Sequence, residues 1–281
     1  MSKNLSISFE FYPPQTTEGM EKLHAARKQL VPLKPEFFSV TFGAGGSTRD
    51  RTLETVKQIQ ADGNPAAPHL SCVGSTRDNI RAILKTYKDL GIKRIVALRG
   101  DLPSGMAATG EFLYANELVA FIRAETGDQF HIEVAAYPEF HPQAKSPRDD
   151  LLNFQRKVNA GADSAITQYF YNADSYFYFV EQCHKLGITI PIVPGIMPIG
   201  KFSQLARFSD ACGAEIPRWI RKTLESYGDD TVSIQAFGMD VVTKLSERLL
   251  AGGAPGLHFY TLNQAAPSVE IWKRLGLQIN S

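Results

Sequence analysis

Ionisable and amide side chains stand at the ends of apolar, strand-like runs in this 281-residue chain. Glu10 lies near the end of the first run, and Arg99-Gly100-Asp101 follows the run Ile95-Val96-Ala97-Leu98. Packing of a core does not require polar residues in these places, so their recurrence indicates a site for chemistry. The other polar strand ends are Thr41, Gln168 and Tyr137-Pro138-Glu139, with His141 just beyond.

Glu10 is the first candidate for proton transfer. Side chains alternate across a strand, so Phe9 and Phe11 face one way and Glu10 the other. If the phenylalanines pack against helices, Glu10 points into the site, where desolvation is expected to raise the pKa of its carboxyl and suit it to general-acid catalysis. A structural carboxylate paired with a lysine or arginine fits the position equally well.

Two further motifs are candidates for anion binding. Arg99 and Asp101 share one face of the chain and are suited to orienting a polar heterocycle or a phosphate, although an internal salt bridge is slightly favoured by the residues alone. The glycine-rich turn at 43–47 has backbone N–H groups suited to a phosphate. It lacks the motifs of a P-loop and of a dinucleotide fingerprint, so a tight turn is favoured there.

These residues need a fold that brings strand ends together. Short β-rich runs alternate with longer helical patterns, which is typical of a parallel sheet. Eight such strands favour an α/β fold, a closed (β/α)8 or TIM barrel, over an open sheet. Strands are expected at 5–12, 37–41, 68–73, 94–98, 131–136, 164–168, 188–193 and 257–260, and helices near 20–30, 48–61, 79–90, 114–125, 149–160 and 173–186.

The barrel prediction also places the site. Functional groups of such barrels gather where the C-terminal ends of the strands meet. The segment between Gly195 and Gly256 is mostly helical in pattern, so extra helices are expected between strands seven and eight. No linker or change of composition divides the chain, so residues 1–281 are expected to form a single catalytic barrel domain.

Composition argues against several classes of protein. Lys and Arg number 30 against 29 Asp and Glu, which gives no basic excess for a nucleic-acid partner. No apolar run is long enough for a membrane span. The three cysteines have no paired spacing, so no disulfide framework is expected and a cytoplasmic location fits. Metal-binding motifs such as Cys-x-x-Cys are absent from the sequence, so no metal is expected.

Eight segments at or near the strand ends form a specific ordered set. They are Ser8-Phe9-Glu10-Phe11-Tyr12-Pro13-Pro14, Ser39-Val40-Thr41-Phe42-Gly43-Ala44, Ala67-Pro68-His69-Leu70, Ala97-Leu98-Arg99-Gly100-Asp101, Ala135-Ala136-Tyr137-Pro138-Glu139, Ala165-Ile166-Thr167-Gln168-Tyr169-Phe170, Pro194-Gly195-Ile196-Met197-Pro198 and His258-Phe259-Tyr260-Thr261-Leu262-Asn263. On these segments the chain resembles the methylenetetrahydrofolate reductase family, in its short bacterial FAD-dependent form, over nearly its whole length.

The resemblance implies an oxidoreductase of one-carbon metabolism. NADH, preferred over NADPH, would reduce FAD, and the reduced flavin would pass hydride to 5,10-methylenetetrahydrofolate. The product, 5-methyltetrahydrofolate, would supply methyl groups for methionine synthesis. By analogy with the family, the protein is expected to be a homo-oligomer.

The resemblance also assigns roles by position. Glu10 matches the general acid, and Asp101 matches a catalytic residue that contacts the pterin and tunes the flavin. Substrate contacts are expected at Gln168, which also serves the nicotinamide, and at Gln204, Phe208 and Gln264. FAD contacts are expected at Thr41, Ala44, His69, Arg99, Gly100, Asp101, Ala115, Tyr137, His141, Asp150 and Lys157.

One departure and three alternatives stand beside this reading. Gln264 occupies a position where the best-known bacterial members carry arginine, which puts its contribution to folate binding in doubt. The alternatives are another flavin-dependent barrel oxidoreductase, a non-catalytic flavin- or folate-binding protein, and a zinc-dependent methyltransferase. Three scattered cysteines do not readily supply the thiolate cluster that the last would need.

Overall fold

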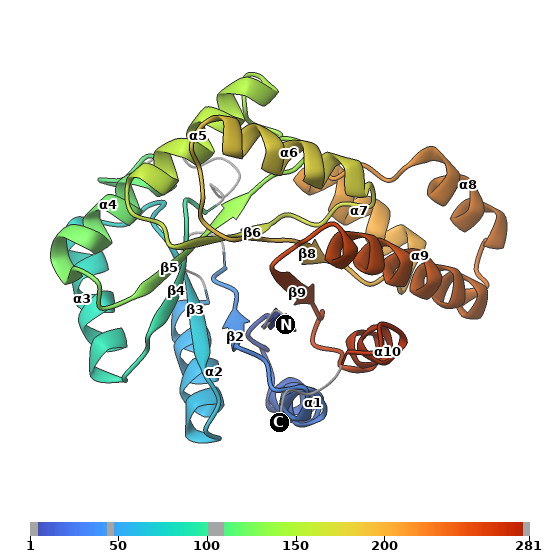
Figure 1. Ribbon diagram of the computed structural model, residues 1–281. Coiled ribbons are helices and arrows are strands. Elements are labelled where there is room, and N and C mark those ends of the chain that lie inside the picture. Colours follow the sequence, from blue (N-terminus) through green and yellow to red (C-terminus); the bar gives the residue numbers. More distant parts are fainter. Residues whose placement is uncertain (1–4, 44–47, 101–109, 278–281) are drawn as a thin grey trace.

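The computed structural model describes residues 5–43, 48–100 and 110–277 of the chain. Its strands form one parallel sheet in the order β7-β6-β5-β4-β3-β2-β1-β9-β8, surrounded by helices (Figure 1). The strands are β1 (Ser6–Phe11), β2 (Phe37–Val40), β3 (Ala66–Ser71), β4 (Arg94–Leu98), β5 (His131–Ala136), β6 (Ser164–Thr167), β7 (Ile192–Val193), β8 (Gly195–Ile196) and β9 (Gly256–Tyr260).

The sheet closes into a ring through a strand that is broken in two. β7 pairs with β6 and β8 pairs with β9, and only Pro194 separates β7 from β8. Proline has no N–H to give to a ladder, which explains the break; its carbonyl oxygen accepts a hydrogen bond of 3.0 Å from the His258 N–H. Because β7 and β8 together make one barrel strand, the predicted (β/α)8 barrel is confirmed.

The seventh strand was predicted at 188–193, which is wrong at both ends. It begins at Ile192 and continues beyond Pro194 to Ile196. Ile188 belongs instead to the turn after α6, where its N–H donates to the Cys183 carbonyl. The apolar character of 188–191 therefore reflects packing, and not membership of the sheet.

The helices follow the predicted alternation, with corrections at their starts. Thr16 and Ser146 cap α1 and α5 by accepting backbone N–H groups, so these helices begin three and two residues earlier than predicted. The helices are α1 (Thr17–Leu30), the 3-10 turn η1 (Val31–Leu33), α2 (Arg49–Ala61), α3 (Arg77–Asp89), α4 (Ala115–Thr126), α5 (Pro147–Asn159), α6 (Ala173–Lys185), α7 (Phe202–Cys212), α8 (Arg218–Tyr227), α9 (Thr231–Ala251) and α10 (Ala266–Arg274).

Two features of this layout bear on the site. The extra helices predicted between strands seven and eight are α7, α8 and α9. Phe9 and Phe11 are buried in the main core, where their rings stack with Phe38, while Glu10 faces the interior of the barrel. The alternation along β1 was therefore predicted correctly.

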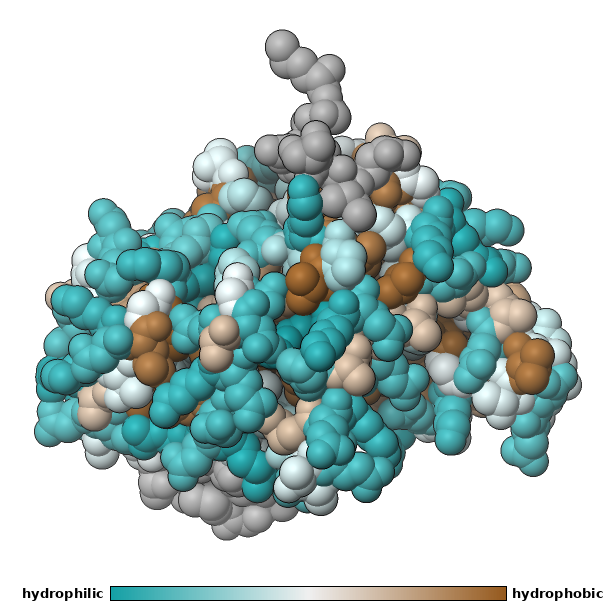
Figure 2. Space-filling view, turned by 90° about the horizontal axis from the view of Figure 1, so that it is seen from below, coloured by the Kyte–Doolittle hydropathy of each residue, from teal (hydrophilic) through white to brown (hydrophobic). Residues whose placement is uncertain are grey.

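The outer surface is mainly hydrophilic on the face seen from below, with small separate groups of hydrophobic residues (Figure 2). Among the described residues, every helix is too short or too polar to cross a bilayer. Within the same residues, no group of three or more His, Cys, Asp or Glu side chains is placed to hold a metal ion.

Candidate active site

Two adjoining pockets open at the C-terminal ends of the strands. The central pocket, of about 380 Å³, lies over the barrel axis and under α7. The flank pocket, of about 270 Å³, lies beside it along β4, α4 and α5. Both are lined by Leu98, Ala135 and Tyr137, so a ligand in one meets a ligand in the other at these residues.

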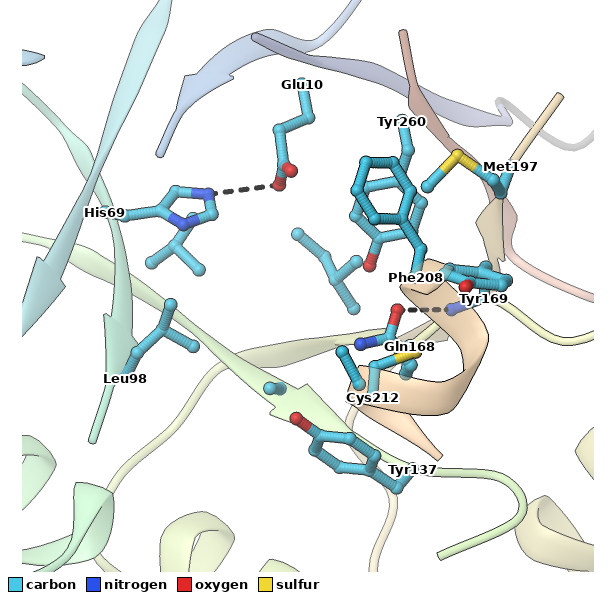
Figure 3. A pocket seen from close by; sticks show the side chains of 14 residues that line it. Glu10, His69, Leu98, Tyr137, Gln168, Tyr169, Met197, Phe208, Cys212 and Tyr260 are labelled. Carbon is cyan, nitrogen blue, oxygen red and sulfur yellow. Dashed lines mark hydrogen bonds and ion pairs between the residues drawn. The ribbon is translucent and has the colours of Figure 1, made fainter. Parts of the chain in front are cut away.

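The central pocket has its ionisable groups on one side. Glu10 on β1 lies with its Oε2 atom 3.2 Å from His69 Nε2 on β3 (Figure 3). The same Oε2 atom lies 3.5 Å from His258 Nε2 on β9. Among the described residues, neither Nε2 atom has a hydrogen-bond partner, and each contact is an ion pair only when its imidazole is protonated. β9 pairs with β1, and β3 lies one strand beyond on the other side, so these three strands bring one carboxyl and two imidazoles together inside the barrel.

His258 is held rigidly inside the barrel. Its side chain is fully buried, and its Nδ1 atom lies 2.7 Å from the Ser8 hydroxyl. The ring stacks on Phe37 and meets the edge of Tyr260. Ser8 precedes Glu10 by two residues on β1, so both side chains point inward and contact the same imidazole.

The pKa of Glu10 was expected to be raised, and that expectation is wrong. Burial does raise it, but the electrostatic and hydrogen-bonding interactions with His69 and His258 outweigh burial and bring the pKa to about 2. The sequence pattern could not indicate this, because His69 and His258 come from strands far away in the chain. The side chain of Glu10 stays 17% exposed, so it reaches the pocket surface.

The opposite wall is largely aromatic. Phe208 and Cys212 project from α7, and Tyr169, Tyr260 and Met197 complete this side (Figure 3). The Tyr260 hydroxyl donates to the Thr167 carbonyl at 2.7 Å, which ties β9 to β6 across the broken strand. The amide oxygen of Gln168 accepts from the Tyr169 N–H at 3.0 Å and fixes that side chain at the pocket floor.

The flank pocket contains the cations that suit an anionic ligand. Arg99 on the β4 end donates to the Gln143 amide oxygen, and Lys157 on α5 donates to the Ala135 carbonyl. Burial lowers the pKa of Lys157 to about 8, against an opposing effect of Asp150. A partly desolvated ammonium beside a guanidinium fits a phosphate-bearing ligand, because an anion would restore the charge that burial disfavours.

The sequence is similar to known enzymes over nearly its full length. A family model described as methylenetetrahydrofolate reductase matches residues 1–276. The 5,10-methylenetetrahydrofolate reductases of Salmonella typhimurium and Escherichia coli are 43% and 42% identical over 275 residues, covering 98% of this chain and 92% of each relative. The chain belongs to the methylenetetrahydrofolate reductase family. It is therefore a reductase of 5,10-methylenetetrahydrofolate, and the family is flavin-dependent in general.

A plant relative and a solved structure are also similar to this reductase. Methylenetetrahydrofolate reductase (NADH) 1 of Zea mays is 39% identical over 289 residues, which cover 97% of this chain and 48% of the maize protein. A solved structure from Clostridium thermocellum, described as binding two copies of 5-methyl-5,6,7,8-tetrahydrofolic acid, has a TM-score of 0.67 at 18% identity. It covers 96% of this chain and 93% of its own, and the likeness shows the fold alone.

Most predicted site residues of the reductase lie in the two pockets. The central pocket contains Glu10, His69, Tyr137, Gln168 and Phe208. The flank pocket contains Arg99, Gly100, Ala115, Tyr137, His141, Asp150 and Lys157. Tyr137 belongs to both pockets and meets the His141 ring edge-on at 4.6 Å.

Three predicted contacts lie outside these pockets. Thr41, Gln204 and Gln264 line neither of them, and Gln264 is exposed on the turn after β9. Gln204 lies on α7 one turn before Phe208. Ala44 and Asp101 lie outside the described residues, so their roles stay predictions.

The structure adds residues that the sequence reading missed. Tyr114, Asn116, Gln143 and Asn153 line the flank pocket, and Tyr169, Met197, Cys212 and Tyr260 line the central one. Tyr169 and Tyr260 belong to segments that resemble the family, which was an available signal. His258 was missed because a histidine inside an apolar strand also fits simple core packing.

Proposed function

We propose that this reductase binds FAD in the flank pocket and the reacting rings in the central pocket, with NADH as the electron donor. The observation that carries the proposal is the junction of the two pockets at Leu98, Ala135 and Tyr137. A ligand with a phosphate-bearing half and a flat ring half spans that junction. Residues 1–281 are then one catalytic unit, and assembly into a homo-oligomer and a cytoplasmic location stay predictions.

The flank pocket has the chemistry that an FAD pyrophosphate and ribose need. Arg99 and Lys157 supply positive charge, and Asp150 accepts the His141 N–H and so shapes the loop between β5 and α5. Tyr114 is 57% exposed at the start of α4 and offers an aromatic face at the pocket rim. When bound, the flavin supplies hydride transfer between the nicotinamide and the folate.

The central pocket has the chemistry that a pterin ring needs. Its walls are mainly apolar and exclude water, while Gln168 presents an amide to ring nitrogens and oxygens. Glu10 provides the proton that a folate nitrogen must take up when the methylene bridge opens. His69 also lines the central pocket, and the family resemblance assigns it to the flavin.

A carboxyl with a pKa near 2 carries no proton of its own at neutral pH. The Glu10 carboxyl lies 3.2 Å from His69 Nε2 and 3.5 Å from His258 Nε2, so the three side chains form one cluster within which a proton can move. We propose that a bound pterin displaces water from Glu10 and that the proton then passes from an imidazole through the carboxylate to the folate.

The two half-reactions test the proposal separately. The FAD-replete protein is mixed with NADH without oxygen, and flavin absorbance is followed; methylenetetrahydrofolate is then added. We expect bleaching in the first step and recovery of colour in the second. If the protein binds no flavin when FAD is supplied, the assignment of FAD to the flank pocket is wrong. If the reduced protein stays colourless after the folate is added, the placement of folate in the central pocket is wrong.

Glu10→Gln is the matched test of the acid. NADH should reduce the flavin of this variant at the normal rate. Reoxidation of the flavin by the folate should be slower by about a hundredfold or more, because only the folate step needs the proton. Glu21→Gln on the exposed face of α1 is the control and should leave both rates unchanged. Equal slowing of both half-reactions by Glu10→Gln would mean that Glu10 is structural.

A further inference from the structure

Helix α7 places a guanidinium at the rim of the central pocket. Arg207 is exposed, yet its guanidinium carbon lies 5.3 Å from the centre of the Phe208 ring, and Phe208 lines the pocket. Successive residues of a helix point about 100° apart, so the Arg207 side chain folds back across Phe208. None of the ion pairs between described residues includes Arg207.

The central pocket itself has no lysine or arginine among its described lining residues. A folate consists of a pterin, then an aminobenzoyl ring, then a tail of glutamate carboxylates. Its charged tail must therefore find a cation outside the pocket. Gln168 and the aromatic Phe208 line the pocket wall, and the cationic Arg207 follows outside the lining residues, against the Phe208 ring.

We propose that Arg207 binds the glutamate carboxylates of the folate tail, next to Phe208, whose folate contact the family resemblance already implies. This inference rests on the placement of the pterin in the central pocket proposed above. The order of pterin, aromatic ring and carboxylate along the ligand matches Gln168 and Phe208 on the pocket wall and Arg207 outside it. NADH matches less well, because a ribose follows its nicotinamide where Phe208 offers an aromatic face.

The chain contains a matched control for this arginine. Arg221 on α8 holds its guanidinium carbon 6.0 Å from the Phe202 ring on α7, which is a similar cation–π pair. Neither residue lines the central pocket or the flank pocket. Loss of Arg221 therefore removes a comparable surface contact with no expected effect on a folate tail.

The test is calorimetric titration of the FAD-replete protein with 5-methyltetrahydrofolate carrying one or three glutamyl residues. Arg207→Gln should weaken binding about three- to tenfold, more for the longer tail, and added salt should reduce the difference. Arg207→Lys should keep most of the affinity, and Arg221→Gln should match the wild type. The rate of bleaching by NADH should stay normal in all three variants.

Three outcomes would overturn the inference. Unchanged folate binding by Arg207→Gln would show that the guanidinium does not contact the tail. An equal loss in Arg221→Gln would assign the effect to general surface charge. If Arg207→Gln needs a higher NADH concentration for flavin reduction but binds folate normally, Arg207 contacts the nicotinamide nucleotide instead. Each of these three outcomes can be observed when folate reoxidises the flavin of the wild-type protein. If folate does not reoxidise the wild-type flavin, the proposed function itself is wrong.

Discussion

Burial in a pocket pushes a carboxyl or an ammonium toward its neutral form. Lys157 follows that rule, with a pKa lowered to about 8, whereas Glu10 is pulled the other way by two imidazoles. The difference lies in the neighbours: Glu10 has His69 and His258 within 3.5 Å, and Lys157 has the single opposing effect of Asp150. The charge of Glu10 is thus decided by residues distant in the chain, whereas Lys157 responds to burial and to Asp150 on its own helix α5.

The lowered pKa of Lys157 predicts how FAD binding depends on pH. Above pH 8 the empty protein has lost this proton, while the pyrophosphate complex favours the charged ammonium, so binding must take up a proton. FAD affinity should therefore fall by up to about tenfold between pH 8 and 9 and stay level below pH 7. Quenching of flavin fluorescence measures the affinity.

Lys157→Met is the control for this dependence. It should bind FAD weakly with a flat profile between about pH 7 and 9. The lowered pKa of Lys157 also affects the stability of the wild type without ligand. The unfolded chain keeps the Lys157 proton up to the ordinary pKa of 10.5, whereas the folded protein loses it near pH 8. The free energy of unfolding therefore rises between pH 8 and 10.5. If the FAD affinity of the wild type depends as little on pH as that of Lys157→Met, Lys157 does not contact the ligand.

At the scale of elements, the broken strand β7–β8 controls closure of the barrel. Gly195 begins β8, donates its N–H to the Thr167 hydroxyl at 2.9 Å, and leaves no room for a side chain. A Cβ atom there would lie 2.6 Å from a ring carbon of Tyr260 and closer still to the Thr167 carbonyl. Tyr260 lines the central pocket, and Thr167 is fully buried directly before Gln168 of that pocket.

Gly195→Ala should therefore lower the free energy of unfolding by about 1–3 kcal/mol, because backbone and a pocket ring must both shift. It should also slow the folate half-reaction, since Tyr260 lines the central pocket. Gly200→Ala is the matched control five residues on, where an added Cβ meets nothing within 4 Å. Urea unfolding of the two variants gives the comparison, and equal midpoints would contradict the steric argument.

At the scale of the whole molecule, the two ends of the barrel have different tasks. The C-terminal ends carry the pockets, and the opposite end is closed by charged residues. Arg94 at the start of β4 pairs with Glu36 and with Glu133, whose side chain is only 2% exposed, and lies over the Phe37 ring. His131 at the start of β5 also faces Glu133 at 3.3 Å.

Arg94→Met should destabilise the protein by roughly 3 kcal/mol, because it leaves the Glu133 carboxylate buried without its arginine. The pKa of Glu133 is lowered in the native protein, despite burial, by its hydrogen bond to His131 and by Arg94. The stabilisation by the ionised Glu133 carboxylate is present above its ordinary pKa of 4.5 and is lost as the pH falls below that value. The difference in the free energy of unfolding between the wild type and Arg94→Met should therefore become smaller in acid.

Thermal unfolding measures this cost, and Arg81→Met at the exposed pair with Glu125 should cost less than about 1 kcal/mol. Folded Arg94→Met should keep both half-reactions, since Arg94 lies at the end of the barrel away from the pockets. Loss of activity without loss of stability would contradict this division between the two ends.

Several features of this protein follow from its sequence alone. The alternation of Phe9, Glu10 and Phe11 assigned Glu10 to the inner face, and the βα rhythm predicted the barrel with its extra helices. Arg99 and Lys157 were assigned to the flavin site through resemblance, and both line the flank pocket. The predictions of the inner face and of the barrel are confirmed because period and residue type are local properties of the chain, and the flavin role of Arg99 and Lys157 stays a prediction.

Only the tertiary structure decided what surrounds those residues. The low pKa of Glu10 requires His69 and His258, which β3 and β9 bring against β1 although one lies 248 positions away in the chain. The break at Pro194, the cover by α7 and the junction of the pockets at Tyr137 also depend on closure of the ring. A residue's position along a strand sets the direction of its side chain, but its charge and its reach depend on which strands and helices pack beside it.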